Sequence, residues 1–354
     1  MKAIKMVSQG QAEVQDAPIP SLRDDYVLVK VKAVALNPTD WKHVDYAPTP
    51  GATVGCDFAG VVEEVGAKVQ KPWKKGDRIA GFTHGCNEAQ LEDGSFAEYL
   101  VAKGDLWMKV PDNLTDEEAA TLGVGVTTVG QSLYQSLGLP LPDSGTKADC
   151  PILIYGGSSA TGSLAIQYAR LSGCTQIITT CSPRNYDFVK SLGAHVALDY
   201  RDPDCAKKIR ELTNDSLAHV LDCITSDESV ALCQAAVGSK GGTIAYLLRA
   251  NKHERTDVQA KYPLGYTVIG EGFSSSWMKA EFPASAEDFE FGKVFWQLSE
   301  KLFAEGKLRV HPPQVEEGGL YGVFDGFQKM REGKVSGVKL VYRVEDTNGL
   351  GEQK

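Results

Sequence analysis

A run of small residues directly after an apolar segment is the strongest chemical signal in this chain. Residues 151–155 (Pro-Ile-Leu-Ile-Tyr) are followed by residues 156–162 (Gly-Gly-Ser-Ser-Ala-Thr-Gly), and residues 163–171 then show helical spacing of their apolar positions. The pattern predicts a buried strand, a tight turn and a helix. Small turn residues let a diphosphate approach the backbone, and the helix start offers it unpaired N–H groups and a positive dipole end. The spacing departs from G-x-G-x-x-G, and ordinary strand–helix turns also use small residues, so the surrounding elements must support this interpretation.

The end of the next predicted strand, residues 177–181, carries the signal for cofactor choice. Folds that bind NAD place Asp or Glu there, to accept hydrogen bonds from the ribose hydroxyls. This chain has Ser182, Pro183, Arg184 and Asn185 instead. A hydroxyl, a guanidinium and an amide can bind a 2′-phosphate, and no carboxylate repels it. Arg184 alone could equally be a solvated cation at a helix start, so the missing acid is the stronger argument for NADPH.

Length and composition bound the protein class. With 354 residues, two domains are expected. Hydrophobic residues make up 42% and charged residues 23%, as in globular proteins with a substantial core. The net charge of −9 argues against nucleic acid or an anionic membrane as a partner. The eight cysteines are scattered without a C-x-x-C, and no long apolar span occurs, so we expect a cytoplasmic location.

Two different patterns of secondary structure are predicted along the chain, one after the other. The first third predicts short strands closed by glycine, at residues 26–35, 58–66, 77–82 and 96–101, followed by a helix from residue 116 to about 137. From residue 151 onward strands and helices alternate, which predicts a parallel sheet covered on both faces. The predicted strands there are 151–155, 177–181, 196–200, 220–224 and 242–247, and a helix is expected at 186–192. Helices at 289–303 and 324–331 and a strand at 337–343 complete the pattern.

This organisation resembles the medium-chain dehydrogenase/reductase superfamily over essentially the whole chain. The blocks that carry the resemblance, in the order of that family, are residues 37–40 (Asn-Pro-Thr-Asp), 55–62, 75–78, 94–99, the glycine turn and 337–341. The resemblance implies an α/β fold with a GroES-like, partly closed β-barrel domain at 1–125 and 275–354. It also implies a doubly wound parallel-sheet (Rossmann) domain at 126–274 that binds NADPH.

Zinc is not expected here. The zinc-dependent members of the superfamily carry Cys in the first block and Gly-His-Glu where this chain has Gly55, Cys56 and Asp57. A catalytic zinc needs three protein ligands and a structural zinc four. Cys86 and His84 are the only candidates in the loop from 81 to 94. We therefore interpret these side chains as non-ligands and the protein as zinc-independent, with no metal.

Within the zinc-free branch the chain is similar to the fungal trans-acting enoyl reductases that serve polyketide synthases. The segments that carry this similarity are residues 137–142, 155–161, 181–185, 198–201 and 222–225. The resemblance implies hydride transfer from NADPH to the β-carbon of an α,β-unsaturated thioester. The developing enolate would then need hydrogen-bond donors at its oxygen.

The same resemblance implies roles for individual residues. Lys42, which follows an expected turn at residues 37–40, and Thr128 fall at the catalytic positions. Lys42 could equally be a surface lysine, and Thr128 could equally be an N-terminal helix residue. The implied cofactor contacts are Thr39, Asp40, Ser158, Ser159, Ala160, Thr161, Ser182, Pro183, Arg184, Asn185, Tyr200, Leu247, Leu248, Val335 and Ser336. The implied substrate contacts are Thr128, Gly265, Tyr266, Thr267, Val268 and Ile269. Residues 265–269 equally fit a strand at a sheet edge, and His43 is interpreted as an incidental surface histidine.

Two alternatives to an enoyl reductase stay open. One is a free-standing quinone or enone oxidoreductase acting on small molecules, and the other is a non-catalytic protein that binds NADPH without turnover. The expected partner is an acyl thioester, possibly carried on a polyketide synthase carrier domain, although the acidic composition offers no obvious docking patch for an acidic carrier. The oligomeric state is left open, with a monomer favoured.

Overall fold

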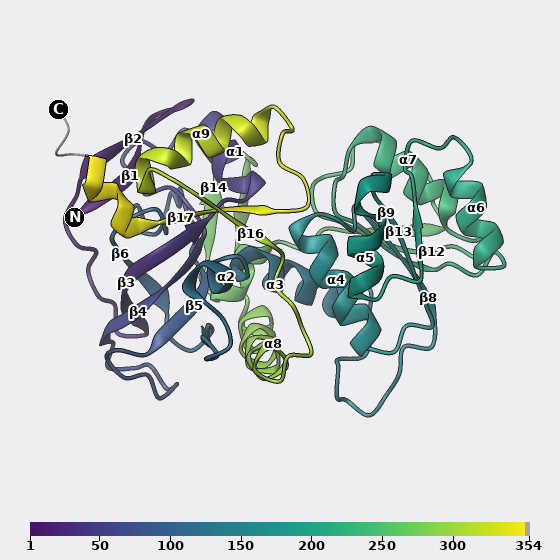
Figure 1. Ribbon diagram of the computed structural model, residues 1–354, viewed down its shortest axis with the longest axis horizontal. Coiled ribbons are helices and arrows are strands. Elements are labelled where there is room, and N and C mark those ends of the chain that lie inside the picture. The colour runs from purple at the N-terminus through teal and green to yellow at the C-terminus, as the bar shows by residue number, and fades with distance from the viewer. Residues whose placement is uncertain (351–354) are drawn as a thin grey trace. The chain divides into compact units, whose positions relative to one another are not determined.

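The computed structural model describes residues 1–350, which divide into two compact units. The first unit comprises residues 1–127 and the chain from residue 266 onward, and the second unit comprises residues 128–265. In Figure 1 the second unit carries the teal and green colours of the middle of the chain. The domain boundaries predicted from the sequence lie between residues 125 and 126 and between residues 274 and 275. Residues 266–274 were therefore assigned to the second domain, whereas in the structure they belong to the first unit.

The first unit is built on a seven-stranded, mostly antiparallel sheet. Its strand order is β16-β17-β3-β4-β5-β7, with β6 paired to β3 outside this path. The strands are β3 (Tyr26–Ala35), β4 (Asp57–Val65), β5 (Arg78–Phe82), β6 (Tyr99–Lys103), β7 (Met108–Lys109), β16 (Pro313–Glu316) and β17 (Lys339–Arg343). Two hairpins accompany it, β1 (Lys2–Ser8) with β2 (Gln11–Asp16) and β14 (Phe273–Ser275) with β15 (Ala280–Phe282).

Helices in the first unit begin at recognisable caps. The helix α2 starts after Thr115, whose hydroxyl accepts a hydrogen bond from the Glu118 N–H while the Glu118 carboxylate accepts one from the Thr115 N–H. The helix α1 has Pro at its first position, where the missing N–H costs nothing. The helices of this unit are α1 (Pro38–Tyr46), α2 (Asp116–Ala120), α8 (Ala286–Ala304) and α9 (Gly319–Arg331). The helix α3 (Gly123–Gly130) contains the boundary between the units.

The second unit is a six-stranded sheet whose strands are all parallel, in the order β10-β9-β8-β11-β12-β13. The strands are β8 (Pro151–Tyr155), β9 (Gln176–Thr180), β10 (Val196–Leu198), β11 (His219–Asp222), β12 (Gly242–Tyr246) and β13 (Val258–Lys261). The helices are α4 (Ala160–Leu171), α5 (Tyr186–Leu192), α6 (Cys205–Leu212) and α7 (Asp227–Ala236), preceded by a π-helix at Gln131–Ser136. The chain reverses its direction of travel across the sheet between β8 and β11, where ligands of doubly wound folds bind.

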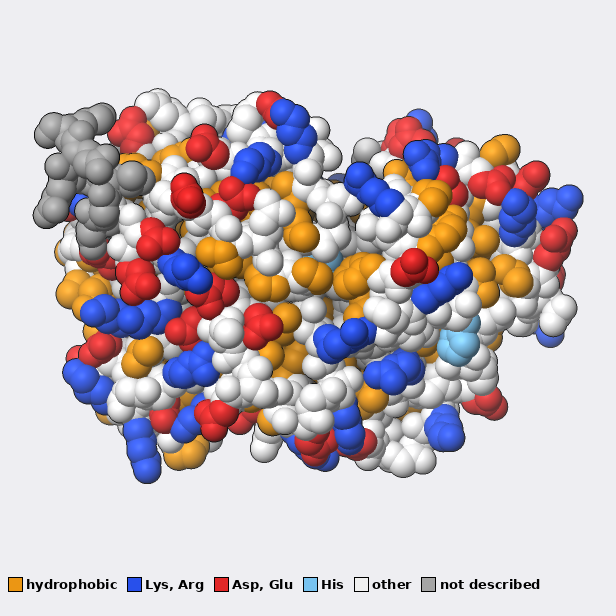
Figure 2. Space-filling model, viewed as in Figure 1, with side chains coloured by type: hydrophobic (Ala, Val, Ile, Leu, Met, Phe, Trp, Pro, Cys, Tyr) orange, Lys and Arg blue, Asp and Glu red, His pale blue; other side chains and the backbone are white. Residues whose placement is uncertain are grey.

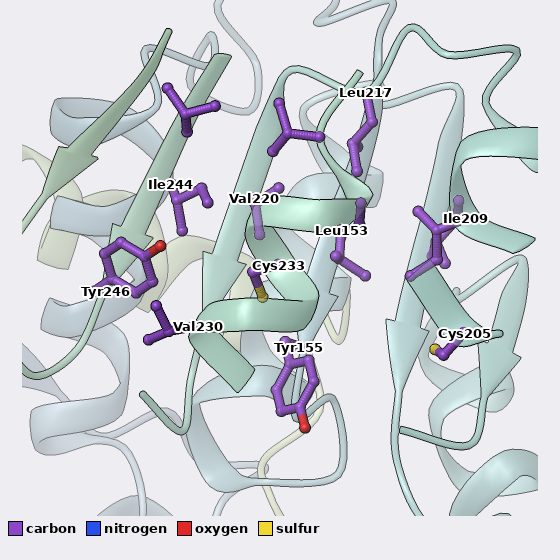
Figure 3. Packing of buried hydrophobic residues seen from close by; sticks show 14 residues of the cluster. Leu153, Tyr155, Cys205, Ile209, Leu217, Val220, Val230, Cys233, Ile244 and Tyr246 are labelled. Atoms are coloured by element: carbon purple, nitrogen blue, oxygen red, sulfur yellow. The ribbon is translucent and has the colours of Figure 1, made fainter. Parts of the chain in front are cut away.

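One part of the core of the second unit lies between its sheet and the helices α6 and α7. Figure 3 shows Ile209 of α6 and Val230 and Cys233 of α7 packing toward the sheet residues Leu153 and Val220. All five side chains are at most 1% exposed. Because both faces of a parallel sheet are covered, its strands are continuous apolar runs, which is the pattern that the sequence displays.

Most predicted elements are confirmed, including the α/β fold class with a doubly wound parallel sheet. Three local expectations are wrong. Residues 38–46 form a helix, although only a turn was expected there, and the single helix predicted from 116 to 137 is broken into α2, α3 and the π-helix. Residues 265–269 form a 3-10 helix and not an edge strand; the edge of the parallel sheet is β13.

The surface carries both signs of charge. Figure 2 shows acidic and basic side chains interspersed on the visible face, so the negative net charge is spread and not gathered there.

Within residues 1–350, no helix has the length and apolar character needed to cross a membrane.

A buried ion pair joins several elements of the first unit. The ammonium of Lys339 donates hydrogen bonds to Asp57 Oδ2 (2.5 Å), Asn37 Oδ1 (2.9 Å) and Thr121 O (3.1 Å), which uses all three of its protons. The second oxygen of the Asp57 carboxylate accepts a hydrogen bond from the Val124 N–H (2.7 Å). Both charges are therefore compensated, which buried ions require.

Removing this ammonium should destabilise the fold strongly. Lys339→Met keeps much of the side-chain volume but leaves the Asp57 carboxylate buried without its cation, so we expect a loss of about 3–5 kcal/mol in the free energy of unfolding. Urea denaturation followed by circular dichroism measures it. Lys334→Met is the matched control, because the exposed Lys334 pairs with Glu332 at the surface and should cost under about 1 kcal/mol. Equal losses in the two variants would contradict this interpretation of the ion pair.

Candidate active site

The glycine turn of the second unit connects β8 to α4 and is shaped by close packing. Gly156 has φ of +85°, a left-handed conformation that favours glycine. A Cβ on Gly157 would clash with the hydroxyl of Thr179, and one on Gly162 would clash with the carbonyl of Gly156. The small residues are thus required for the turn itself to pass this close to β9 and to the helix start.

The same turn presents unpaired hydrogen-bond donors. Ser159 caps α4: its hydroxyl accepts from the Gly162 N–H (3.0 Å) and donates to the Gly156 carbonyl (2.7 Å). Within residues 1–350, the N–H groups of Ser158, Ala160 and Thr161 have no acceptor. Three unpaired N–H groups at the N-terminus of a twelve-residue helix form a cradle for an anion.

The segment after β9 presents a free cation. Pro183–Asn185 is a 3-10 helix, and Arg184 is exposed with no ion pair or hydrogen bond in the described part of the chain. Asp199 directly follows β10, the strand that pairs with β9. Arg201 binds the Asp199 carboxylate through two hydrogen bonds (2.9 and 2.8 Å) and holds the pKa of Asp199 below its usual value. Tyr200 is 41% exposed, and its ring lies 6.1 Å from that of Tyr155.

Two exposed apolar side chains lie at the same edge of the sheet, after β11 and β12. Leu248 is 43% exposed, and its N–H donates to the hydroxyl of Thr225 (3.3 Å); Leu247, just before it, is half-buried. Ile224 is 46% exposed and lies against Gly156. Leu248 is among the contacts that the resemblance implies, whereas Ile224 is not. The signal for Ile224 is an apolar residue two positions after Asp222, the carboxylate that ends β11.

In the first unit, α1 carries four of the residues under consideration. Asp40 is 1% exposed and its carboxylate accepts a hydrogen bond from the Asn37 N–H (2.7 Å), so it is used to start the helix. Burial, reinforced by the neighbouring Asp57 carboxylate, raises the pKa of Asp40 to about 7. Lys42 is half-buried and burial lowers its pKa; within residues 1–350 its ammonium has no carboxylate partner.

Thr39 and His43 belong to a partly buried chain of hydrogen bonds. The hydroxyl of Thr39 lies 2.9 Å from that of Tyr266 and 3.3 Å from Nδ1 of His43. The ring of His84 stacks on Tyr266 with 3.9 Å between centroids. Burial lowers the pKa of His43 to about 4 and that of His84 to about 3, so both are neutral at pH 7. The interpretation of His43 as a surface residue is wrong, because it is 6% exposed.

Cys56, which lies in the block where zinc-dependent members of the superfamily carry Gly-His-Glu, contacts Tyr266. Cys56 is buried, its Sγ lies 3.7 Å from the Tyr266 hydroxyl, and burial raises the pKa of its thiol. Burial also raises the pKa of Cys86. Across residues 1–350 no three side chains of His, Cys, Asp or Glu come together in a way that could hold a metal ion.

The remaining candidates occupy three places. Thr128 lies inside α3 and not at its start; it is half-buried and its hydroxyl has no partner in the described chain, whereas the adjacent Thr127 accepts a hydrogen bond from Trp296 Nε1 (3.0 Å). Val335 and Ser336 lie between α9 and β17 and are half-buried and exposed, respectively. The 3-10 helix of residues 265–269 buries Tyr266, Val268 and Ile269 and carries Gly265 and Thr267 half-buried.

Comparison with known proteins agrees with this architecture. The family model described as alcohol dehydrogenase GroES-like domain matches residues 23–112, and the one described as zinc-binding dehydrogenase matches residues 160–284. Among solved structures, the CurK enoyl reductase is 20% identical with a TM-score of 0.74, covering 97% of this chain and 98% of that one. The quinone oxidoreductase from Coxiella burnetii is 25% identical with a TM-score of 0.71, covering 97% and 99%.

Similarity to curated proteins is much higher. The chain is 47% identical over 346 residues to the trans-enoyl reductase ACTTS2 of Alternaria alternata, which covers 97% of this chain and 99% of the relative. The superfamily implies a nicotinamide cofactor, and the unpaired N–H groups of the glycine turn fit the diphosphate of such a group. By its fold, its family matches and this identity, the chain belongs to the trans-enoyl reductase family of the medium-chain dehydrogenases/reductases.

Proposed function

We propose that this protein is an NADPH-dependent enoyl reductase that reduces the C=C bond of an α,β-unsaturated thioester carried by a polyketide synthase. The observation that carries this proposal is the 47% identity to a relative named trans-enoyl reductase, which extends over 97% of the chain. The enoyl reductase fold of CurK supports it.

The second unit would hold the cofactor through its own backbone and side chains. The N–H groups of Ser158, Ala160 and Thr161, which have no acceptor within residues 1–350, would donate to the diphosphate. Arg184, which no carboxylate of the described chain neutralises, would bind a 2′-phosphate, and this favours NADPH over NADH. NADPH, when bound, supplies the hydride. Further proposed contacts are Thr39, Asp40, Ser159, Ser182, Pro183, Asn185, Tyr200, Leu247, Leu248, Val335 and Ser336.

Lys42 and Thr128 are the proposed catalytic residues. The ammonium of Lys42 has no carboxylate partner within the described part of the chain, so it would donate a hydrogen bond, or a proton, where negative charge develops on the substrate. The Thr128 hydroxyl, equally without a partner in the described residues, would position the thioester. The segment 265–269 would contribute the buried, mainly apolar surface of Tyr266, Val268 and Ile269, which suits an alkyl chain.

Replacing either catalytic candidate should lower turnover and leave cofactor affinity nearly unchanged. For Lys42→Ala and Thr128→Ala we expect kcat to fall by about 100-fold, because a positioned donor is lost, while the Kd of NADPH changes by under about twofold. Lys74→Ala, which removes an exposed lysine, is the control and should retain full activity. Unchanged kcat in both variants would remove these residues from the mechanism.

Cofactor choice can be tested at Arg184. Arg184→Ala should weaken NADPH by about 10- to 100-fold, as expected for losing a charge-assisted hydrogen bond to phosphate, while NADH binding changes little. Fluorescence titration with each nucleotide measures both constants. Lys190→Ala removes another exposed cation nearby, on α5, and should affect neither. An equal loss for NADPH and NADH would argue against a phosphate contact.

Substrate class is decided by one assay. We expect the purified protein to oxidise NADPH with crotonyl-CoA and not with a simple quinone. Turnover of the quinone alone would favour the alternative of a free-standing quinone oxidoreductase, whose fold the Coxiella burnetii enzyme shares. Tight NADPH binding without oxidation by any acceptor would indicate a non-catalytic binding protein.

A further inference from the structure

Three reactive side chains meet at the amino-terminal edge of the second unit's sheet. Cys150 directly precedes β8, Cys174 lies two residues before β9, and His219 is the first residue of β11. In the sheet, β8 lies between β9 and β11. Pro151 pairs with Gln176 across one side of β8, and Ile152 pairs with His219 across the other. The topology alone therefore brings the two thiols and the imidazole to one place.

The backbone holds the two cysteine segments together. The Thr175 N–H donates to the Cys150 carbonyl (3.0 Å), the Ala148 N–H to the Ser172 carbonyl (2.8 Å) and the Asp149 N–H to the Gly173 carbonyl (3.3 Å). Across this contact the Cys150 thiol interacts with the Cys174 thiol and with the His219 side chain, whose Nδ1 has no hydrogen-bond partner within residues 1–350. Because these backbone hydrogen bonds hold the two cysteine segments side by side, the thiols need little movement to form a covalent bond.

Cys150 differs from the other cysteines in its surroundings. Its interactions with Cys174 and His219 lower the pKa of its thiol, against the opposing effects of burial and of the Asp149 carboxylate. The pKa of each of the other seven thiols is raised, for Cys174 chiefly by its interaction with Cys150 and elsewhere chiefly by burial. Cys150 is also half-buried, whereas Cys174 is only 7% exposed. One thiol is thus activated and reachable, and its partner is shielded.

We propose that Cys150 and Cys174 are a redox-active thiol pair that hydrogen peroxide converts reversibly into a disulfide. The Cys150 thiolate attacks one peroxide oxygen, the O–O bond breaks, and the released hydroxide takes a proton to become water. The resulting sulfenic acid at Cys150 is attacked by the sulfur of Cys174, so the S–S bond forms while the S–O bond breaks. The leaving oxygen departs as a second water with the Cys174 proton. His219 positions and activates Cys150, and the site is independent of the reductase activity.

Mass spectrometry of the full chain after peroxide treatment tests this pair. The oxidised protein should lose the mass of two hydrogens, and trypsin should release peptide 148–170 linked to peptide 171–184, with reversal by a thiol reductant. Because Cys181 shares the second peptide, Cys181→Ser is the matched control and must keep the link. Cys174→Ser must abolish it and leave a sulfenic acid at Cys150 that dimedone traps.

The reactivity of Cys150 provides a second readout in the unoxidised protein. Iodoacetamide should modify Cys150 faster than any other cysteine, and His219→Gln should slow this reaction by about tenfold, the effect of losing a hydrogen bond to a charged group. A link through Cys181, oxidation of Cys150 beyond sulfenic acid without any link, or no mass change would each overturn the proposal. If Cys174→Ser does not fold, the peptide link in wild type and Cys181→Ser still decides it.

Discussion

The paired ammonium of Lys339 is the contact on which the geometry of the first unit depends. It connects the first residue of β17 to Asn37, which directly precedes α1, to the first residue of β4 and to Thr121, which directly follows α2. Since each of its protons has an acceptor and Asp57 also holds the first turn of α3, none of these elements can shift without leaving a buried charge unpaired. The orientation of α1, and with it of Thr39 and Lys42, follows from this constraint.

The sequence predicts well those features whose causes are local. The glycine turn is determined by residues within one strand–turn–helix unit, and its small side chains could be interpreted without knowing the rest of the chain. The absence of an acid between Ser182 and Asn185 is local in the same sense. By contrast, the surroundings of His43 depend on Tyr266, more than 200 residues away, so no pattern near His43 could reveal its burial.

The local errors also have physical causes. Asn37-Pro38 is compatible with both a turn and a helix start, and the Asp40 carboxylate that bonds back to the Asn37 N–H decides for the helix. The break after α2 occurs where a Cβ on Gly123 would clash with the Asp57 carboxylate, so the glycine lets the Val124 N–H reach it. In both cases a buried side chain in the tertiary structure, and not local helix propensity, sets the boundary.

The parallel sheet of the second unit separates the edge that carries Cys150 from the edge that carries the glycine turn. Every strand begins at the edge that carries Cys150 and ends at the edge that carries the glycine turn, so the length of β8, five residues or about 17 Å, stands between them. A fluorophore or spin label attached to Cys150 would thus report on this unit from the edge opposite the glycine turn, without covering that turn. The signal of such a label could be followed while a ligand is added at the opposite edge of the sheet.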